Sequence, residues 1–171
     1  FIVHRLDRDT SGVLLFAKSE AAKHAWQDRW NELVIRRGYL AVVEGAPERD
    51  RGTVKSRLKE TSTHLVYSAG PDQGGGREAV TRYAVKRRGS RYSLLEVDID
   101  TGRKNQIRVH MSDLGHPVAG DRQYGAATSP LGRLCLHAHV LELRHPATGA
   151  PVRFEAPIPP GFLRLAGTGG E

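Results

Sequence analysis

An aspartate flanked by arginines near the amino end of this chain could hold reactive chemistry. Asp7 lies between Arg5 and Arg8 in the stretch His4-Arg5-Leu6-Asp7-Arg8-Asp9-Thr10-Ser11-Gly12, which precedes the apolar run 13–17. Thr, Ser and Gly favour turns, and a turn that leads into a buried strand can fix the geometry of a side chain. An ionised aspartate in such a place can act as a nucleophile or a general base. The alternative is an ordinary turn in which Asp7 only hydrogen-bonds the backbone.

Asp7 and Asp9 also permit a second interpretation, the carboxylate pair of a metal-dependent nuclease or a glycosidase. Residues i and i+2 share one face of an extended chain. Two-metal sites usually gather carboxylates from several elements, however, and the sequence offers no clear third. We therefore favour a single working aspartate.

Histidines are numerous enough to raise a metal hypothesis, since the chain has eight of them. His137 and His139 share one face of a predicted strand, but Cys135 is the only cysteine and no three ligands have zinc-like spacing. We predict no metal site.

The composition points to a single globular domain that binds an anionic partner. The chain has 171 residues, of which 39% are hydrophobic, enough to bury a core. The formal net charge is +7, and the 26 basic residues comprise six lysines and 20 arginines. Arginine grips phosphate bidentately and stacks on bases, so nucleic acid leads the expected partners. Codon usage in a GC-rich genome is the alternative explanation of the arginines.

Cysteine usage and hydropathy indicate the compartment. A lone cysteine excludes an internal disulfide, and no apolar run approaches the roughly 20 residues that span a bilayer. We expect a cytoplasmic protein, without a membrane anchor or an obligate protein partner, and monomeric. Because the chain opens on Phe1 in a segment that already reads as structured, we also expect that an upstream segment has been removed.

The elements that must position Asp7 follow from periodicity and turn residues. Residues 12–17 predict a strand, and Ser19 predicts the cap of a helix with Ala22, Trp26, Trp30 and Leu33 on its apolar face. We interpret the two tryptophans as core residues; base stacking is the alternative. Further strands are predicted at 39–45, 52–55, 65–67, 79–87, 93–100, 134–143 and 152–156.

A second helix is predicted from Lys104 to Leu114, ending at Gly115. The glycine-rich segment 71–76 lacks a P-loop ending, so we expect a loop and no nucleotide site there. Strands dominate without βαβ alternation. The fold class is therefore predicted as α+β, a mixed, largely antiparallel sheet with flanking helices, over residues 1–160, followed by a Gly-rich tail at 161–171.

Four motifs together resemble the signatures of the RluA-type pseudouridine synthases, which isomerise uridine in ribosomal or transfer RNA. They are the stretch 4–12, Arg37-Gly38-Tyr39-Leu40-Ala41-Val42-Val43-Glu44-Gly45, the segment 101–110 with 115–125, and Leu136-His137-Ala138 with His145-Pro146. The resemblance extends from Phe1 to about Pro159. It implies the pseudouridine synthase catalytic fold and a reaction that needs no cofactor.

The resemblance also implies roles for single residues. Asp7 matches the family's catalytic aspartate, Tyr39 its active-site tyrosine, and Arg108 the arginine that pairs with the aspartate. Arg5 matches a position that can reach into RNA as the target base leaves the stack. Arg8, Arg103 and Lys104 are further candidates for RNA binding. Whether Asp7 attacks the sugar, attacks the ring or acts as a base stays open at this point.

Two departures from the family pattern matter. Lys104-Asn105 stands where many relatives carry Thr-His, and the upstream Lys-Pro-x-Gly segment common in the family is not in this sequence. The resemblance therefore implies a catalytic domain that is incomplete at its amino end. The alternative function is a non-catalytic RNA-binding module derived from this fold.

Overall fold

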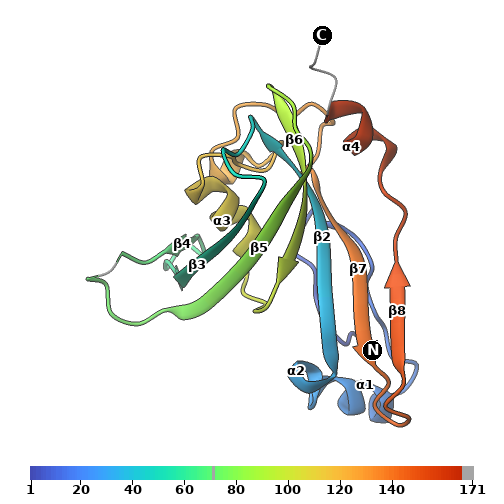
Figure 1. The fold of residues 1–171 in the computed structure, drawn as a ribbon. Coiled ribbons are helices and arrows are strands. Elements are labelled where there is room, and N and C mark those ends of the chain that lie inside the picture. Colours follow the sequence, from blue (N-terminus) through green and yellow to red (C-terminus); the bar gives the residue numbers. More distant parts are fainter. Residues whose placement is uncertain (71, 167–171) are drawn as a thin grey trace.

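One mixed sheet forms the body of the molecule in the computed structural model, which describes residues 1–70 and 72–166 (Figure 1). Its strands are β1 (Ser11–Gly12), β2 (Val34–Glu44), β3 (Arg51–Glu60), β4 (Val66–Ser68), β5 (Arg77–Arg87), β6 (Tyr92–Ile99), β7 (Leu136–Arg144) and β8 (Pro151–Glu155). They lie in the order β1-β7-β2-β6-β5-β3-β4, and β8 pairs with β7. Only the β1–β7 pair is parallel among these pairings. The predicted α+β class with a largely antiparallel sheet is confirmed.

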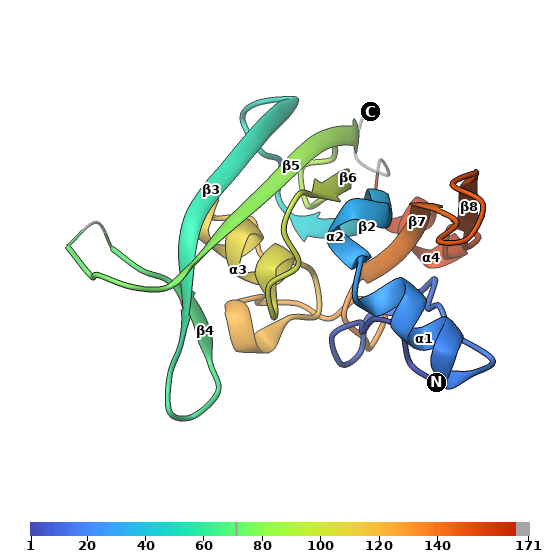
Figure 2. The same cartoon turned by 90° about the horizontal axis from the view of Figure 1, so that it is seen from below.

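Within the described residues, four α-helices and one short 3₁₀ turn accompany the sheet. They are α1 (Glu20–Gln27), α2 (Trp30–Leu33), α3 (Gln106–Asp113), η1 (Arg122–Tyr124) and α4 (Pro160–Leu165). Figure 2 shows α3 on one face of the sheet, with β3 and β5 to one side and α1 and α2 to the other. None of the helices in the described part of the chain is long and apolar enough to cross a membrane.

The core lies between the middle of the sheet and the helices α3 and α4. Val42 and Leu95 are fully buried on β2 and β6, and Met111 of α3 and Phe162 of α4 pack into the same cluster. Burial of such side chains contributes roughly 1.5–3 kcal/mol each. This packing fixes the start of α3 against the sheet.

Most predicted elements are present with shifted ends. The strands at 39–45, 79–87, 93–100, 134–143 and 152–156 correspond to β2, β5, β6, β7 and β8, and the helix predicted from Lys104 begins at Gln106. Gly115 follows that helix with φ +79°, as its predicted role as a stop requires. The loop predicted at 71–76 includes residue 71, which lies outside the described residues.

Two predictions near the amino end were wrong in extent. The strand expected at 12–17 is reduced to Ser11–Gly12, because the chain then turns so that Phe16 forms an antiparallel bridge with Ile2. The helix capped by Ser19 ends at Gln27, and Trp30 starts the separate helix α2, which runs directly into β2. Trp26 and Trp30 therefore lie on separate helices and contact different rings, His145 and His4 respectively.

The tail predicted from residue 161 was also wrong in part. Residues 160–165 form α4, and Phe162 is fully buried. Gly161 packs closely on Leu131: a Cβ at residue 161 would lie 2.8 Å from Leu131 Cδ1, so the Leu131 side chain would have to shift. Residues 167–171 of the predicted tail lie outside the described residues.

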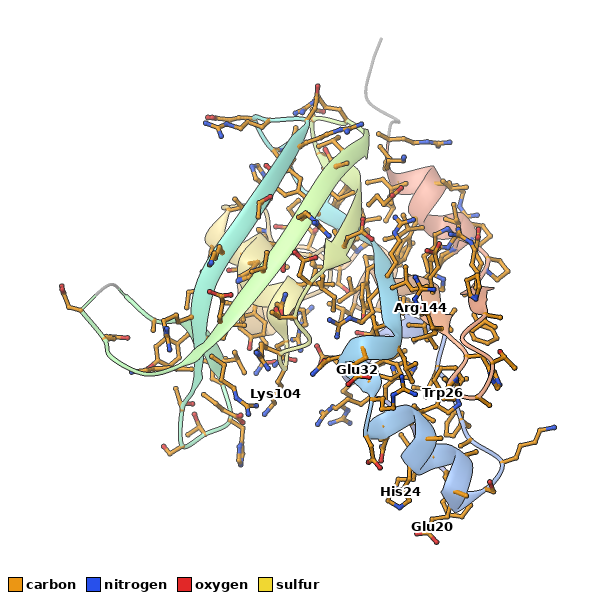
Figure 3. The ribbon with its side chains drawn as sticks, turned by 60° about the horizontal axis from the view of Figure 1, so that its bottom comes forward. Glu20, His24, Trp26, Glu32, Lys104 and Arg144 are labelled. Atoms are coloured by element: carbon orange, nitrogen blue, oxygen red, sulfur yellow. The ribbon has the colours of Figure 1, made fainter. Side chains whose placement is uncertain are left out.

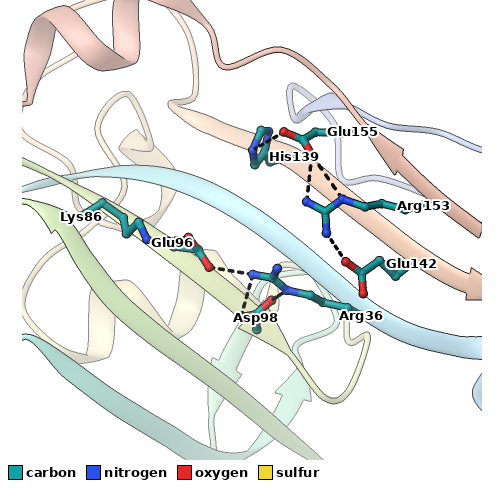
Figure 4. A network of polar contacts seen from close by, with 8 residues as sticks. All are labelled: Arg36, Lys86, Glu96, Asp98, His139, Glu142, Arg153 and Glu155. Atoms are coloured by element: carbon teal, nitrogen blue, oxygen red, sulfur yellow. Dashed lines mark hydrogen bonds and ion pairs between the residues drawn. The ribbon is translucent and has the colours of Figure 1, made fainter.

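The sheet face opposite the candidate site carries a network of paired charges (Figure 4). Arg36 bonds Asp98 and Glu96 at 2.7 Å each, and Arg153 pairs with Glu142 and Glu155. Alternation along β2 sends Arg36 to this face and the neighbouring Arg37 to the other. The positive charge of these arginines is thus matched locally.

Candidate active site

Asp7 and Tyr39 line the same cavity, which has a volume of about 140 Å³. Its wall comes from the amino-terminal loop, α2, β2, the end of β6, the segment before α3 and β7. A cavity of about 150 Å³ can hold a benzene-sized ring. The space therefore suits one six-membered ring, and the sequence prediction that Asp7 and Tyr39 come together is consistent with this geometry.

The Asp7 carboxylate is held at one oxygen. The backbone N–H of Asn105 donates to Asp7 Oδ2 at 3.0 Å. Asn105 precedes α3 in the left-handed conformation, with φ +54°, which Asn tolerates better than most residues. Within the described residues, Asp7 Oδ1 accepts no hydrogen bond, so one oxygen is fixed and the other is available.

Burial raises the pKa of Asp7 above its ordinary value. The charge of Arg108, the Asn105 N–H and the charges of Arg5 and Lys104 act in the opposite direction. The Asp7 carboxylate is partly desolvated, and its raised pKa makes it a better proton acceptor than an exposed aspartate.

Tyr39 and Arg37 project from β2 into the same cavity. Burial raises the pKa of Tyr39 to about 12, so its phenol is protonated at neutral pH. Arg37 is held by a 2.9 Å hydrogen bond from Nη2 to the Asp100 carbonyl, and its buried Nε has no hydrogen-bond partner among the described residues. The β2 strand thus presents one neutral donor and one cation beside Asp7.

Arg108 does not form the expected ion pair with Asp7. Its Nε and Nη2 donate to the two oxygens of Asp121 at 2.7 Å each, and its Nη1 donates to Asn105 Oδ1 at 3.0 Å. Asp121 precedes η1 and lies 13 positions after Arg108 in the sequence. Its side chain is 1% exposed, so this bidentate contact is a buried ion pair. The Arg108 charge reaches Asp7 only as a longer-range electrostatic interaction.

The four candidate RNA-binding residues occupy three places. Arg5 is exposed and Arg103 is partly buried, and both line the Asp7 cavity. Arg8 lines a neighbouring groove instead. Lys104, labelled in Figure 3, extends from the segment before α3, and its Nζ lies 2.5 Å from Glu60 Oε1 on β3.

Sequence reasoning missed two residues of the site. Trp30, interpreted as core, lines the cavity and stacks on His4 with ring centroids 5.0 Å apart. Asn105 was noted only as a departure from the family pattern, yet it joins Asp7, Arg108 and Tyr124, whose hydroxyl accepts from Asn105 Nδ2 at 3.1 Å. The preference of Asn for left-handed backbone just before a helix is the signal that could have identified it.

A buried chain of hydrogen bonds supports the segment that holds Asp7. Gln106 Oε1 accepts from the Arg103 N–H, so its Nε2 is free to donate to Thr81 Oγ1 at 3.0 Å. Thr81 in turn contacts His110 Nδ1 at 2.8 Å, and His110 Nε2 contacts Ser56 Oγ at 2.9 Å.

This chain of hydrogen bonds ends at the Asp113 carboxylate, which can only accept, and the donor in each bond follows from that. Ser68 Oγ lies 3.0 Å from Ser56 and donates to Asp113 Oδ2 at 2.5 Å. Since Ser68 has one hydroxyl proton, Ser56 must donate to Ser68, and His110 must carry its proton on Nε2 and accept at Nδ1. The chain therefore ties β3, β4 and β5 to α3 with one neutral form of His110.

The described residues contain no group of three or more His, Cys, Asp or Glu side chains that could hold a metal ion. His137 instead contacts Ser11 Oγ through Nδ1 at 2.7 Å, and Ser11 also accepts from Arg133 Nη2 at 2.7 Å. These contacts join the amino-terminal loop to β7.

Comparison with known proteins agrees with the motifs. Over 168 residues the chain is 40% identical to an uncharacterized RNA pseudouridine synthase of Synechocystis sp., covering 96% of this chain and 51% of that protein. It is 39% identical over 178 residues to ribosomal large subunit pseudouridine synthase D of Xylella fastidiosa, covering 96% and 53%. The chain thus spans about half the length of the curated relatives it matches.

A solved structure shares the fold. Human RNA pseudouridylate synthase domain containing 1 superposes with a TM-score of 0.79 at 29% identity, over 91% of this chain and 68% of that one. Residues 1–113 match the family described as RNA pseudouridylate synthase. These residues include Asp7, Tyr39 and Arg108, and the chain belongs to the RNA pseudouridylate synthase family.

Proposed function

We propose that this protein isomerises uridine to pseudouridine in RNA, with Asp7 as its catalytic residue. The reaction breaks the bond between uracil N1 and the sugar C1′, turns the base, joins C5 to C1′ and moves the C5 proton away. The observation that carries the proposal is the Asp7 carboxylate, with Oδ2 fixed by Asn105 and Oδ1 without a partner among the described residues, in a cavity of single-ring size. A carboxylate held in this way is oriented for attack or proton transfer.

Tyr39 supports the same reaction from β2. Its ring can stack on the loose uracil and keep it in the cavity. Because the pKa of Tyr39 is about 12, the phenol enters the reaction as a hydrogen-bond donor, and it can accept the C5 proton only after passing on its own.

RNA is the substrate of the proposed reaction, and the target nucleotide must leave its stack to reach Asp7. Flipping a nucleotide costs a few kcal/mol, which phosphate contacts can offset. Arg5 is exposed at the cavity wall, where it can occupy the space that the flipped base leaves. Relatives named for the ribosomal large subunit favour ribosomal RNA, with transfer RNA as the other candidate. We further propose that the protein acts in the cytoplasm as a monomer.

Release of tritium from RNA labelled at uridine C5 tests the proposal. The unmodified protein should release label, and Asp7→Asn should release none while keeping its affinity for RNA, since the positive surface is unaltered. Asp28→Asn is the control, because Asp28 is an exposed aspartate between α1 and α2 that does not line the cavity, and the substitution should leave release unchanged.

Two outcomes would contradict the assignment. A folded protein that binds RNA but releases no label would favour the alternative, a non-catalytic RNA-binding module. Collapse of RNA binding in folded Asp7→Asn would show that Asp7 does not act mainly in the chemistry.

A further inference from the structure

A second groove, beside the Asp7 cavity, is lined by four arginines. It has a volume of about 430 Å³, and its wall includes Arg8, Arg108, Arg122 and Arg133 together with Asp9 and Asp121. Arg8 directly follows Asp7, and the Arg108 charge reaches Asp7. The groove therefore adjoins the loop that carries the catalytic residue.

The charges in this groove, which we call the arginine groove, are unbalanced. Its lining holds two more cations than anions, and Asp121 is occupied by the bidentate contact from Arg108. Arg8 and Arg122 are exposed, and their side chains make no ion pair or hydrogen bond with the described residues. Their contrast with the paired arginines on the opposite face (Figure 4) is clear. The unpaired guanidiniums remain available to an anion.

Part of the groove is rigid. Arg133 is fixed by hydrogen bonds to Ser11 Oγ at 2.7 Å and to the Leu134 carbonyl at 3.0 Å. Gly120 has φ +84°, and a Cβ there would lie 2.0 Å from the Arg133 carbonyl oxygen. The backbone segments at 120 and 133, which both line the groove, must therefore pass very close together.

We propose that the arginine groove binds phosphates of the RNA strand next to the target uridine, with Arg8 and Arg122 as the contacting residues. Guanidinium groups match phosphate oxygens bidentately, and a nucleotide in the Asp7 cavity brings its neighbours' phosphates to the adjoining groove. This inference rests on the proposed function, and it assigns a path to the RNA backbone outside the cavity.

Salt dependence of RNA binding tests the groove. For single-stranded RNA, each lost phosphate contact should reduce the slope of log K against log salt concentration by about 0.7. Arg8→Gln and Arg122→Gln should each show this reduction and should raise KM several-fold with kcat unchanged. Arg144→Gln is the matched control, since Arg144 is exposed on β7 (Figure 3) and likewise has no polar partner among the described residues.

The outcomes separate the groove from the proposed activity. Phosphate binding by the arginine groove would be contradicted by equal slope losses in all three variants. It would also be contradicted by no loss in Arg8→Gln and Arg122→Gln. Neither result would contradict the proposed activity. If the unmodified protein releases no tritium but the two groove variants still lose RNA affinity relative to Arg144→Gln, phosphate binding by the groove is supported and the proposed activity is contradicted.

Discussion

The Asn105 backbone N–H and the Asp7 carboxylate, 98 positions apart in the chain, are joined by a 3.0 Å hydrogen bond. The same asparagine accepts from Arg108, which is bound to Asp121. Arg108 thus acts on Asp7 through a shared neighbour and through its charge. Arg108 therefore has a structural role, through its contacts with Asp121 and Asn105, and a separate electrostatic effect on the pKa of Asp7. The two can be measured independently.

Loss of Arg108 should destabilise the fold through Asp121. In Arg108→Gln the Asp121 carboxylate, whose side chain is 1% exposed, would lose its cation. Removing one partner of a buried ion pair typically costs about 3–5 kcal/mol. Urea unfolding should show a loss of this size, and the double variant Arg108→Gln/Asp121→Asn should recover most of it. A double variant as unstable as Arg108→Gln would contradict the role of Asp121.

The pH dependence of activity should report the charge of Arg108 at Asp7. If Asp7 works in its ionised form, kcat/KM should decline on the acid side as Asp7 takes up a proton. The Arg108 charge lowers the pKa of Asp7, against the larger effect of burial. In the stable double variant Arg108→Gln/Asp121→Asn this acid limb should therefore move to higher pH.

A pH profile from tritium release at substrate concentrations below KM makes this measurement. Arg144→Gln, which removes a distant exposed charge, should leave the limb in place. An unchanged limb in the double variant would mean that Arg108 has no electrostatic influence on the reacting group.

Sequence reasoning found the strand that carries Tyr39 and the helix that carries Arg108, because strand alternation and glycine stops act locally. The family resemblance implied Asp7 as the partner of Arg108, whereas the structure pairs Arg108 with Asp121, and tertiary packing makes that choice between two carboxylates. In the structure both oxygens of Asp121 accept from Arg108, so Asp121 is the ion-pair partner.

Local patterns also misplaced Trp30 and Phe162. Trp30 has the spacing of a helix face, but the break after Gln27 places it in a second helix, where it reaches the cavity. Phe162 follows a glycine that suggested a tail, whereas Gly161 permits close packing on Leu131. In both cases a long-range contact overrides the local preference.

Asp7→Asn should abolish turnover without costing stability. The folded pKa of Asp7 is raised, so the native state binds its proton more tightly than the unfolded chain does. Stability then falls as the pH rises from the unfolded value of 3.8 through the folded pKa, and the cost is complete above it. Asn carries no charge and avoids that cost.

Chemical unfolding at pH 7 should therefore give Asp7→Asn a free energy of unfolding equal to or above that of the unmodified protein. The difference should shrink at acid pH, where Asp7 is protonated. A loss above about 1 kcal/mol at pH 7, a typical cost of an unfavourable substitution, would show that the ionised carboxylate stabilises the fold.

His110 should make the fold sensitive to acid, because its hydrogen-bond chain requires the neutral ring. Burial lowers the pKa of His110 below 6.5, so the unfolded chain takes up a proton more readily than the native state. Stability should consequently fall as the pH drops from about 6.5 towards the folded pKa. Protonation at Nδ1 would also stop this ring nitrogen from accepting from Thr81, whose hydroxyl oxygen accepts from Gln106.

His110→Gln, which is neutral at every pH used, should reduce the slope of the free energy of unfolding between about pH 5 and 7. His4 and His137, whose pKa values are also lowered by burial, account for the slope that remains. His24→Gln, at an exposed histidine of α1 (Figure 3), is the control and should keep the full slope. If His110→Gln unfolds with the same pH dependence as the unmodified protein, the neutral ring is not what links β3, β4 and β5 to α3. If the slope falls and kcat falls more than KM changes, the chain positions the segment that holds Asp7.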